Sequence, residues 1–181
     1  MKIIAIGGEP GAGKSTLMKN IMFAYHFDQC FDKFKLVPYH HSTDQNKNIY
    51  ILGKYEEGET FSGTDRMSMA VQPEAIKFLA SLDSNAVVLF EGDRLFTSSF
   101  LEHCVDNYDT EIVYLKTDKN IREERYKERG SAQNETWLQG RETKISNILG
   151  NMSLMFNTVK YKNNNKDDQK KIVAYISSRL F

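Results

Sequence analysis

Residues Gly7–Thr16 read Gly-Gly-Glu-Pro-Gly-Ala-Gly-Lys-Ser-Thr and directly follow the apolar run Lys2-Ile-Ile-Ala-Ile. Such a continuous β-branched run is typical of a strand that is buried on both faces, as in a parallel sheet. From Lys14 to about Asp28, apolar residues recur at spacings of three and four, which predicts a helix. The glycine-rich stretch is therefore expected to join a buried strand to the first turn of a helix.

The pattern Gly8-x-x-x-x-Gly13-Lys14-Ser15 within this stretch fits the P-loop motif, and its strand-to-helix context fits as well. Glycines let successive backbone N–H groups converge on one point, toward which the helix also directs its positive end, so phosphate is expected there. Lys14 is predicted to reach the β- and γ-phosphates, and the Ser15 hydroxyl to ligate Mg²⁺. Thr16 is expected to cap or pack. The expected nucleotide-binding residues of the loop are Gly8, Glu9, Pro10, Gly11, Ala12, Gly13, Lys14, Ser15 and Thr16.

Along the rest of the chain, short apolar runs alternate with segments of helical periodicity. The expected strands are residues 35–41, 49–54, 86–90, 111–115 and 158–162, of which 49–54 is either a short strand or an extended segment. The expected helices are residues 73–82, 98–107, 118–129, 141–156 and 167–180, with a polar loop at 130–140. This alternation predicts the α/β class: one domain over residues 1–181, with a five-stranded, mostly parallel sheet covered by helices on both faces.

Composition excludes some partners. The chain has 24 Lys and Arg against 24 Asp and Glu, so its net charge of zero does not indicate nucleic-acid binding by overall charge, although a local basic patch is compatible with it. Cys30 and Cys104 lie far apart and are expected to be reduced thiols. No stretch approaches the roughly 18 apolar residues of a membrane span. We expect a cytoplasmic protein without a membrane partner, and the sequence does not indicate its oligomeric state.

A P-loop at Gly8 of a 181-residue chain resembles the small kinases of the nucleoside monophosphate kinase-like superfamily. The segment Asn163–Asp168 is interpreted as not matching the guanine-reading signature Asn-Lys-x-Asp of GTPases, which argues against guanine specificity, and motor ATPases usually have larger cores. The resemblance covers the organisation of the whole chain, and the P-loop is its specific motif. It implies a single P-loop kinase domain with ATP as the phosphoryl donor and Mg²⁺ as the metal ion. It also implies that the base lies near Arg122 and Asn163–Asn165.

A second acidic site follows the apolar run 87–90, which ends in Glu91-Gly92-Asp93-Arg94. In P-loop proteins a carboxylate at the end of a buried strand holds Mg²⁺, usually through water. We therefore predict Glu91 and Asp93 as metal-site residues together with Ser15, with Asp93 also a candidate proton acceptor. Arg94 either binds an acceptor phosphate or pairs with Asp93. The alternative is an ordinary acidic turn at the end of a strand.

Arginines at spacings of three and four line one face of the helix predicted at 118–129. They are Arg122, Arg125 and Arg129, and Arg141 follows after the polar loop. Kinases of this superfamily close an Arg-bearing lid over the phosphates, which excludes water and neutralises charge on the transferring group. The resemblance thus implies a lid at about residues 122–141. It makes Arg125 and Arg129 catalytic candidates and Arg122 and Arg141 nucleotide-binding candidates. The alternative is a solvated helix face whose arginines pair with the interleaved glutamates.

The phosphoryl acceptor is expected near two loops, one with Asp44 and one with Thr64-Asp65-Arg66. A hydroxyl acceptor must lose a proton, so a nearby carboxylate helps, and Asp44, Asp65 and Asp93 are the candidates. Asp44, Thr64, Arg66 and Arg94 are the expected substrate-binding residues. The alternative for Thr64–Arg66 is an Asp-Arg pair in a surface turn.

The loop Gly63-Thr-Asp-Arg-Met-Ser68, together with the Glu91-Gly-Asp93 strand end, also looks like small phage-type P-loop kinases. Some of these phosphorylate hydroxymethylated pyrimidines such as 5-hydroxymethyluracil in DNA, so this resemblance implies DNA as a partner in the cytoplasm of a host cell. Three functions stay open. The first is an ATP-dependent kinase acting on a hydroxyl of a nucleotide-like or modified-DNA acceptor. The second is a nucleoside monophosphate kinase, and the third is a nucleotide-binding switch or NTPase.

Overall fold

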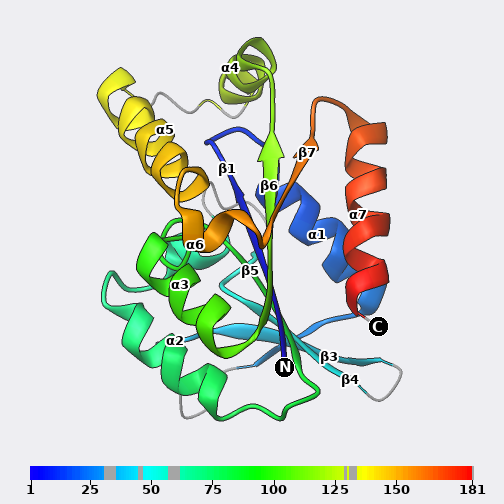
Figure 1. The fold of residues 1–181 in the computed structure, drawn as a ribbon. Coiled ribbons are helices and arrows are strands. Elements are labelled where there is room, and N and C mark those ends of the chain that lie inside the picture. Colours follow the sequence, from blue (N-terminus) through cyan, green and yellow to red (C-terminus); the bar gives the residue numbers. More distant parts are fainter. Residues whose placement is uncertain (31–35, 45–46, 57–61, 129, 131–133, 181) are drawn as a thin grey trace.

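The computed structural model describes residues 1–181 except 31–35, 45–46, 57–61, 129, 131–133 and 181 (Figure 1). The side chains of Gln29, Cys30 and Asp44 also lie outside the described part. Within the described residues, no helix has both the length and the apolar character needed to cross a membrane.

A single seven-stranded sheet forms the centre of the molecule, in the order β2-β3-β4-β5-β1-β6-β7. The parallel strands are β4 (Lys47–Leu52), β5 (Val87–Glu91), β1 (Lys2–Gly8), β6 (Asp109–Lys116) and β7 (Thr158–Lys162). The strands β2 (Asp28–Cys30) and β3 (Tyr39–Asp44) extend one edge in antiparallel fashion. The prediction of a mostly parallel sheet is confirmed, but the predicted number of five strands was wrong, because β2 was not foreseen and residues 49–54 were left open as a strand or an extended segment.

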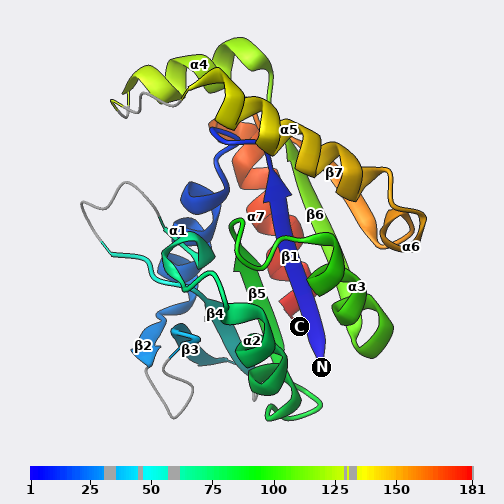
Figure 2. The same ribbon diagram turned by 90° about the vertical axis from the view of Figure 1, so that its left-hand side faces the viewer.

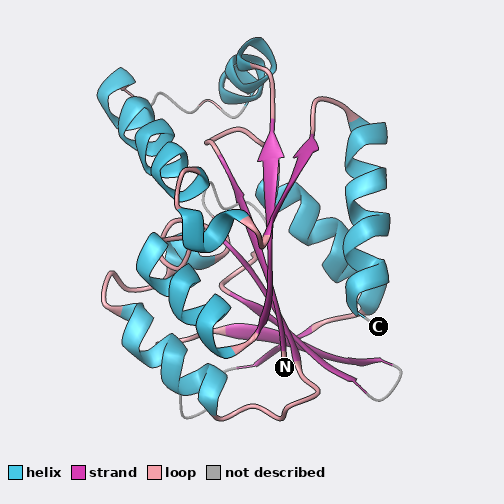
Figure 3. Ribbon diagram, in the orientation of Figure 1, coloured by secondary structure: helices cyan, strands magenta, loops and turns pink. Residues whose placement is uncertain are grey.

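Helices cover both faces of this sheet (Figures 1 and 3). One face carries α1 (Lys14–Tyr25) and α7 (Lys166–Leu180). The other carries α2 (Val71–Ala80), α3 (Ser98–Asn107), α5 (Glu135–Leu149) and the short α6 (Met152–Met155). Strand β1 shows why two layers are needed, since Ile3 and Ala5 pack into one core while Ile4 and Ile6 pack into the other. Burial of apolar side chains on both faces is what stabilises the layered arrangement.

The segments that depart from the predicted pattern are mostly polar. The strand expected at 35–41 is β3, shifted to Tyr39–Asp44, and it forms a hairpin with β4. The polar loop expected at 130–140 is largely helical, because α5 begins at Glu135 with Asn134 as its N-cap. The Asn134 side chain accepts a hydrogen bond from the Trp137 N–H group at 2.8 Å, which fixes this start.

The carboxyl ends of the parallel strands gather the loops that follow β1, β5, β6 and β7 at one edge of the sheet (Figure 2). Helix α4 (Lys119–Glu128) and the first turns of α5 stand above this edge. In open α/β sheets, ligands bind outside the carboxyl ends of the strands, and the P-loop and Glu91 lie at this end.

Candidate active site

The P-loop spans the turn between β1 and α1. Helix α1 starts at Lys14 with Gly13 as N-cap in the left-handed conformation (φ 86°), and no side chain caps its first turn. A Cβ atom at Gly13 would lie 2.7 Å from the Asn163 side-chain nitrogen, so both the backbone angle and the packing require glycine. The uncapped N–H groups of this first turn form the anion-binding end that the sequence predicts.

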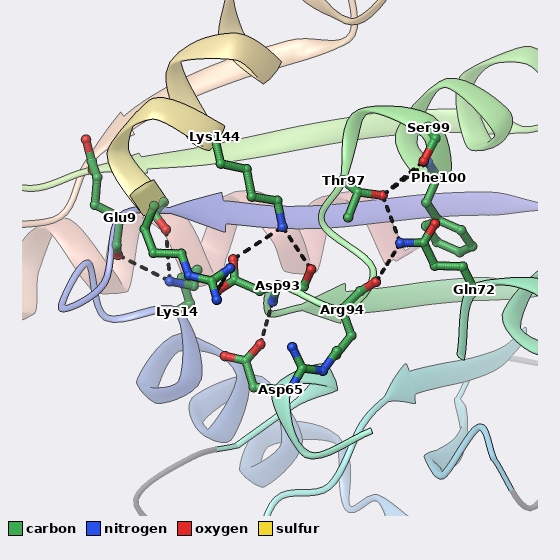
Figure 4. A network of polar contacts seen from close by, with 12 residues as sticks. Glu9, Lys14, Asp65, Gln72, Asp93, Arg94, Thr97, Ser99, Phe100 and Lys144 are labelled. Atoms are coloured by element: carbon green, nitrogen blue, oxygen red, sulfur yellow. Dashed lines mark hydrogen bonds and ion pairs between the residues drawn. The ribbon is translucent and has the colours of Figure 1, made fainter. Parts of the chain in front are cut away.

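The Lys14 side chain lies along the loop rather than out in solvent. Its Nζ atom donates hydrogen bonds to the carbonyl oxygens of Gly8 at 2.9 Å and Glu9 at 3.2 Å (Figure 4). The loop backbone therefore places the ammonium group beside the N-terminus of α1, where it can contact a phosphate.

Ser15 and Glu91 meet at the centre of the site. The Ser15 hydroxyl donates to Glu91 Oε1 at 3.0 Å, and the Tyr55 hydroxyl lies 3.4 Å from the same oxygen. Glu91 is 1% exposed at the end of β5. Burial raises the pKa of its carboxyl to about 7, against the opposing effect of nearby Lys14. Among the described residues no cation forms an ion pair with Glu91, and a divalent ion would stabilise such a buried carboxyl in its charged form.

The chemistry of this pair fits Mg²⁺. The described residues contain no group of three or more His, Cys, Asp or Glu side chains that would hold a metal by themselves. Mg²⁺ commonly takes only one or two protein oxygens and completes its octahedron with water and phosphate oxygens. The Ser15 hydroxyl and the Glu91 carboxylate are two such hard ligands beside the P-loop.

Asp93 is directed elsewhere. Its carboxylate contacts two cations of α5, with Oδ2 2.8 Å from Arg141 Nη1 and Oδ1 3.6 Å from Lys144 Nζ. Lys144 also donates to the Asp93 carbonyl oxygen at 2.9 Å (Figure 4). The structure thus separates Asp93 from the Ser15–Glu91 pair, and the predicted Asp93–Arg94 pair does not form, because Arg94 Nε donates to the Met67 carbonyl at 3.3 Å.

Asp65 lies in the short 3-10 helix Thr64–Arg66, which packs against the strand end. The Asp93 N–H group donates to Asp65 Oδ1 at 2.5 Å (Figure 4). Burial, and then the charge of Asp93, raise the pKa of the Asp65 carboxyl, while Lys14 and Arg94 act in the opposite direction. Asp65 is therefore within electrostatic reach of the P-loop lysine, as a carboxylate facing the acceptor side would be.

The other predicted substrate residues are less tightly grouped. Thr64 is fully buried, and its hydroxyl has no hydrogen-bond partner among the described residues. Arg66 Nη1 lies 2.5 Å from Glu56 Oε2, on the outer side of the loop. The predicted substrate role of Asp44 was wrong, because Asp44 pairs with Lys47 at the turn between β3 and β4, at the amino end of β4. Strand β4 runs parallel to β5 and β1, so this turn lies at the end of the sheet opposite to the P-loop.

The predicted lid arginines take separate positions. Arg125 donates to the carbonyl oxygens of Gly11 at 3.0 Å, Asn163 at 3.1 Å and Asn164 at 3.2 Å. Arg122 Nη1 is 3.0 Å from Glu142 Oε1 and so links α4 to α5. Arg141 contacts Asp93 and stacks on the Trp137 ring at 4.9 Å. Arg129 lies outside the described residues.

The contact of Arg125 with Gly11 joins helix α4 to the P-loop. The guanidinium of Arg125 donates to the Gly11 carbonyl oxygen, so it stabilises the conformation of the phosphate-binding loop. Arg122 contacts Glu142 on α5, and Arg125 contacts carbonyl oxygens of two loops. The alternative of a solvated helix face, paired only with glutamates of its own helix, therefore does not describe these two arginines.

Several residues that hold the P-loop were missed from the sequence. Asn163 is 1% exposed, and its Nδ2 atom donates to the Ala12 carbonyl at 2.7 Å. The Thr117 hydroxyl donates to the Asn163 carbonyl at 3.1 Å, and the Tyr126 hydroxyl donates to the Pro10 carbonyl at 2.5 Å. Their positions in the sequence could have indicated this role, because Thr117 directly follows β6 and Asn163 directly follows β7, and these strands end near the P-loop.

A cavity of about 440 Å³ opens beside the start of α1. Its lining consists of Gly13, Thr16, Arg125, Glu128, Asn163, Asn164, Asn165, Lys166 and Gln169. This includes Asn163–Asn165, as predicted for the nucleotide base, but not Arg122. The volume suits a purine base, since ligand pockets start at about 300 Å³.

Comparison with known proteins identifies the family. The model of the family described as P-loop Nucleotide Kinase3 matches residues 1–172. The chain belongs to this family. No curated protein matches it. Among solved structures it is similar to an uncharacterized protein from Eubacterium ventriosum ATCC 27560, with 17% identity, a TM-score of 0.47 and coverage of 99% of this chain and 100% of the other. It is also similar to a shikimate kinase from Bacteroides thetaiotaomicron, with 15% identity, a TM-score of 0.39 and coverage of 98% and 97%.

Membership of this family of nucleotide kinases assigns the chain a kinase type of function with a nucleotide-binding P-loop. The interpretation that Asn163–Asp168 lacks the guanine-reading pattern was wrong, because Asn165-Lys166-Asp167-Asp168 matches Asn-Lys-x-Asp. In this kinase the Asn165 side chain instead accepts hydrogen bonds from the N–H groups of Asp167 and Asp168 at 3.0 and 2.9 Å. Asp168 Oδ2 accepts from the Asn164 N–H group at 2.9 Å. The pattern forms the N-terminal cap of α7.

Proposed function

We propose that this protein is a Mg·ATP-dependent kinase that transfers the γ-phosphoryl group to a hydroxyl of a nucleotide-like acceptor. The observation that carries the proposal is Asp65, a largely buried carboxylate with a raised pKa that is held beside the end of β5 by the Asp93 N–H group. Among the described residues Asp65 forms no ion pair, whereas Asp93 contacts two cations. A group in this environment is suited to take a proton.

On the donor side, the P-loop N–H groups and Lys14 hold the phosphates of ATP, and the base enters the cavity beside Asn163. Ser15 and Glu91 hold Mg²⁺, which when bound neutralises charge on the phosphates. Arg125 keeps the loop in shape through its contact with the Gly11 carbonyl.

On the acceptor side, Asp65 removes the proton from the hydroxyl as its oxygen attacks the γ-phosphorus, and ADP leaves. The hydrogen bond from the Asp93 N–H group occupies Oδ1 and leaves Oδ2 to accept this proton. The raised pKa favours the reaction, because it makes the carboxylate a stronger base at neutral pH. A monophosphate acceptor would need no such base.

The proposed acceptor class is a hydroxymethylated pyrimidine, either free or in DNA. The resemblance of the loop Gly63–Ser68 to phage-type kinases motivates it, and Arg66, Arg94 and Lys144 supply positive charge near Asp65 and Asp93. Such a local group of cations can bind strand phosphates even though the whole chain has zero net charge. A nucleoside monophosphate kinase is the second candidate, because the Arg94 guanidinium acts on Asp65 and lies where an acceptor phosphate could bind.

Phosphoryl transfer from γ-labelled ATP tests the proposal. The acceptors to offer are nucleosides, nucleoside monophosphates, and DNA duplexes matched except for hydroxymethyl groups on their pyrimidines, with labelled GTP as an alternative donor. Lys14→Ala should abolish transfer, while Lys19→Ala, an exposed lysine on the same helix, should leave it unchanged.

Label in a hydroxymethyl base or nucleoside supports the proposal. Label in a nucleoside diphosphate identifies the second candidate instead. Full activity of the Lys14→Ala variant would show that the P-loop does not bind the donor. Tight ATP binding with no transfer to any acceptor would favour a nucleotide-binding switch.

A further inference from the structure

We propose that Arg141 and Lys144 bind phosphate oxygens of the substrates, and that the Asp93 carboxylate competes with those oxygens for the same two cations. The inference rests on the proposed kinase function. It adds Lys144 to the phosphate-binding residues and gives Asp93 the role of an internal competitor rather than that of a metal ligand or base.

The three side chains form one compact group between α5 and the end of β5. Arg141 Nη1 and Lys144 Nζ lie 2.8 and 3.6 Å from the two carboxylate oxygens of Asp93. Each of the three side chains is about a quarter exposed, with values of 27%, 26% and 25% for Arg141, Lys144 and Asp93. The group is therefore open to a small anion and only partly shielded from solvent.

The position of this group relative to the P-loop points to phosphate. The charges of Lys14 and Asp93 both affect the pKa of Asp65, and the charge of Asp65 in turn affects the pKa of Lys144. The group of Asp93, Arg141 and Lys144 therefore lies within electrostatic reach of Lys14, the phosphate-binding lysine. Figure 4 shows Lys14, Asp93 and Lys144 together at the end of the strand. Burial lowers the pKa of Lys144 while Asp93 raises it, which indicates a cation that gains from an anionic partner.

A carboxylate between an arginine and a lysine offers the same contacts as a phosphate, because both anions present two oxygens to the guanidinium. The contacts that hold α5 near the site are otherwise apolar at its C-terminal half, where Ile145 and Ile148 enter the core. Exchange of Asp93 for phosphate would thus replace ionic contacts of Arg141 and Lys144 without disturbing the buried part of the helix.

The competing explanation is a structural ion pair that only anchors α5. The two explanations predict opposite signs for one variant. If Asp93 competes, Asp93→Asn should tighten phosphate binding, because it removes the rival anion and keeps the size of the side chain. If Asp93 only anchors the helix, the same variant should weaken binding or leave it unchanged.

The experiment is calorimetric titration of inorganic tripolyphosphate, and then of ATP, in the absence of Mg²⁺. Asp93→Asn should lower the Kd of tripolyphosphate about fivefold, which corresponds to the upper range for partly exposed ion pairs. The gain should disappear in the Asp93→Asn/Lys144→Gln double variant. Glu74→Gln, which breaks the 2.7 Å Glu74–Lys77 contact on α2, is the matched control and should not change the Kd.

An unchanged or increased Kd in folded Asp93→Asn, with normal ATP binding by the wild type, overturns this inference alone. Failure of the wild type to bind ATP both without and with Mg²⁺ overturns the proposed kinase function as well. If Asp93→Asn does not fold, Arg141→Gln and Lys144→Gln carry the test, since each must then weaken tripolyphosphate binding at least about threefold. Wild-type affinity in both variants contradicts the proposal.

Discussion

Replacing Glu91 by glutamine should change how the stability of the protein depends on pH. Glu91 is 1% exposed, and burial raises the pKa of its carboxyl from 4.5 to about 7. In the unfolded chain the group ionises near 4.5, whereas in the folded protein it keeps its proton up to about 7. The protonated carboxyl therefore makes its full contribution to the free energy of unfolding below pH 4.5. This contribution is lost as the pH rises from 4.5 to about 7.

The size of this loss follows from the two pKa values. At 1.36 kcal/mol for each pH unit, the difference between 4.5 and about 7 corresponds to about 3 kcal/mol. Glutamine retains a side-chain oxygen that can accept from Ser15 and Tyr55, but it does not ionise. Glu91→Gln should therefore gain about 2.5 kcal/mol of stability relative to wild type between about pH 5 and pH 8.

Urea denaturation at a series of pH values, without metal or nucleotide, measures this difference. Glu74→Gln, at a partly exposed carboxylate on α2, serves as the control and should show a difference from wild type that is nearly independent of pH. Addition of Mg·ATP should stabilise the wild type more at pH 8 than at pH 6, because a cation beside Glu91 favours its ionised form. A difference between Glu91→Gln and wild type that stays constant from pH 5 to 8 would show that Glu91 is not a buried, protonated carboxyl.

Two further variants test the acceptor base and the brace on the P-loop. Asp65→Asn should lower the rate of phosphoryl transfer at least about tenfold while the Kd of ATP stays the same, as measured by rapid quench and calorimetry, and an unchanged rate would exclude Asp65 as the base. Arg125→Met removes hydrogen bonds to three carbonyls and should cost about 2 kcal/mol of stability and weaken ATP binding. Arg125→Lys should not restore that binding, because an ammonium group cannot reproduce the planar fork, and full rescue in calorimetry would argue for charge alone.

The central strands and the P-loop could be predicted because their signals are local. Strand β1 is apolar from Ile3 to Ile6, because Ile3 and Ile4 face different cores, and the phosphate-binding loop follows the strand directly. The antiparallel edge and the start of α5 gave no such signal. The first turns of α5 carry mostly polar, exposed residues between Glu135 and Gly140, so no apolar periodicity marks them.

The supports of the site could not be predicted because they join distant parts of the chain. Arg125 contacts Gly11 across 114 residues, and Asn163 contacts Ala12 across 151. The spacing of arginines on α4 drew attention to Arg125, which contacts the phosphate-binding loop. It could not indicate that one of them binds backbone carbonyls, because those carbonyls belong to loops at the ends of β1 and β7.

Glu91 and Asp93 illustrate the same limit within three residues. The sequence suggests that both carboxylates face one metal, yet Glu91 contacts Ser15 while Asp93 contacts α5. Gly92 between them adopts a φ of 105°, and a Cβ atom there would lie 2.7 Å from the Thr64 hydroxyl. This left-handed residue turns the chain so that the two acids diverge and brings the Asp93 N–H group onto Asp65. The different contacts of Glu91, Asp93 and Asp65 thus depend on the backbone conformation of Gly92. The sequence permits this conformation, but the packing of Thr64–Arg66 against the strand end selects it.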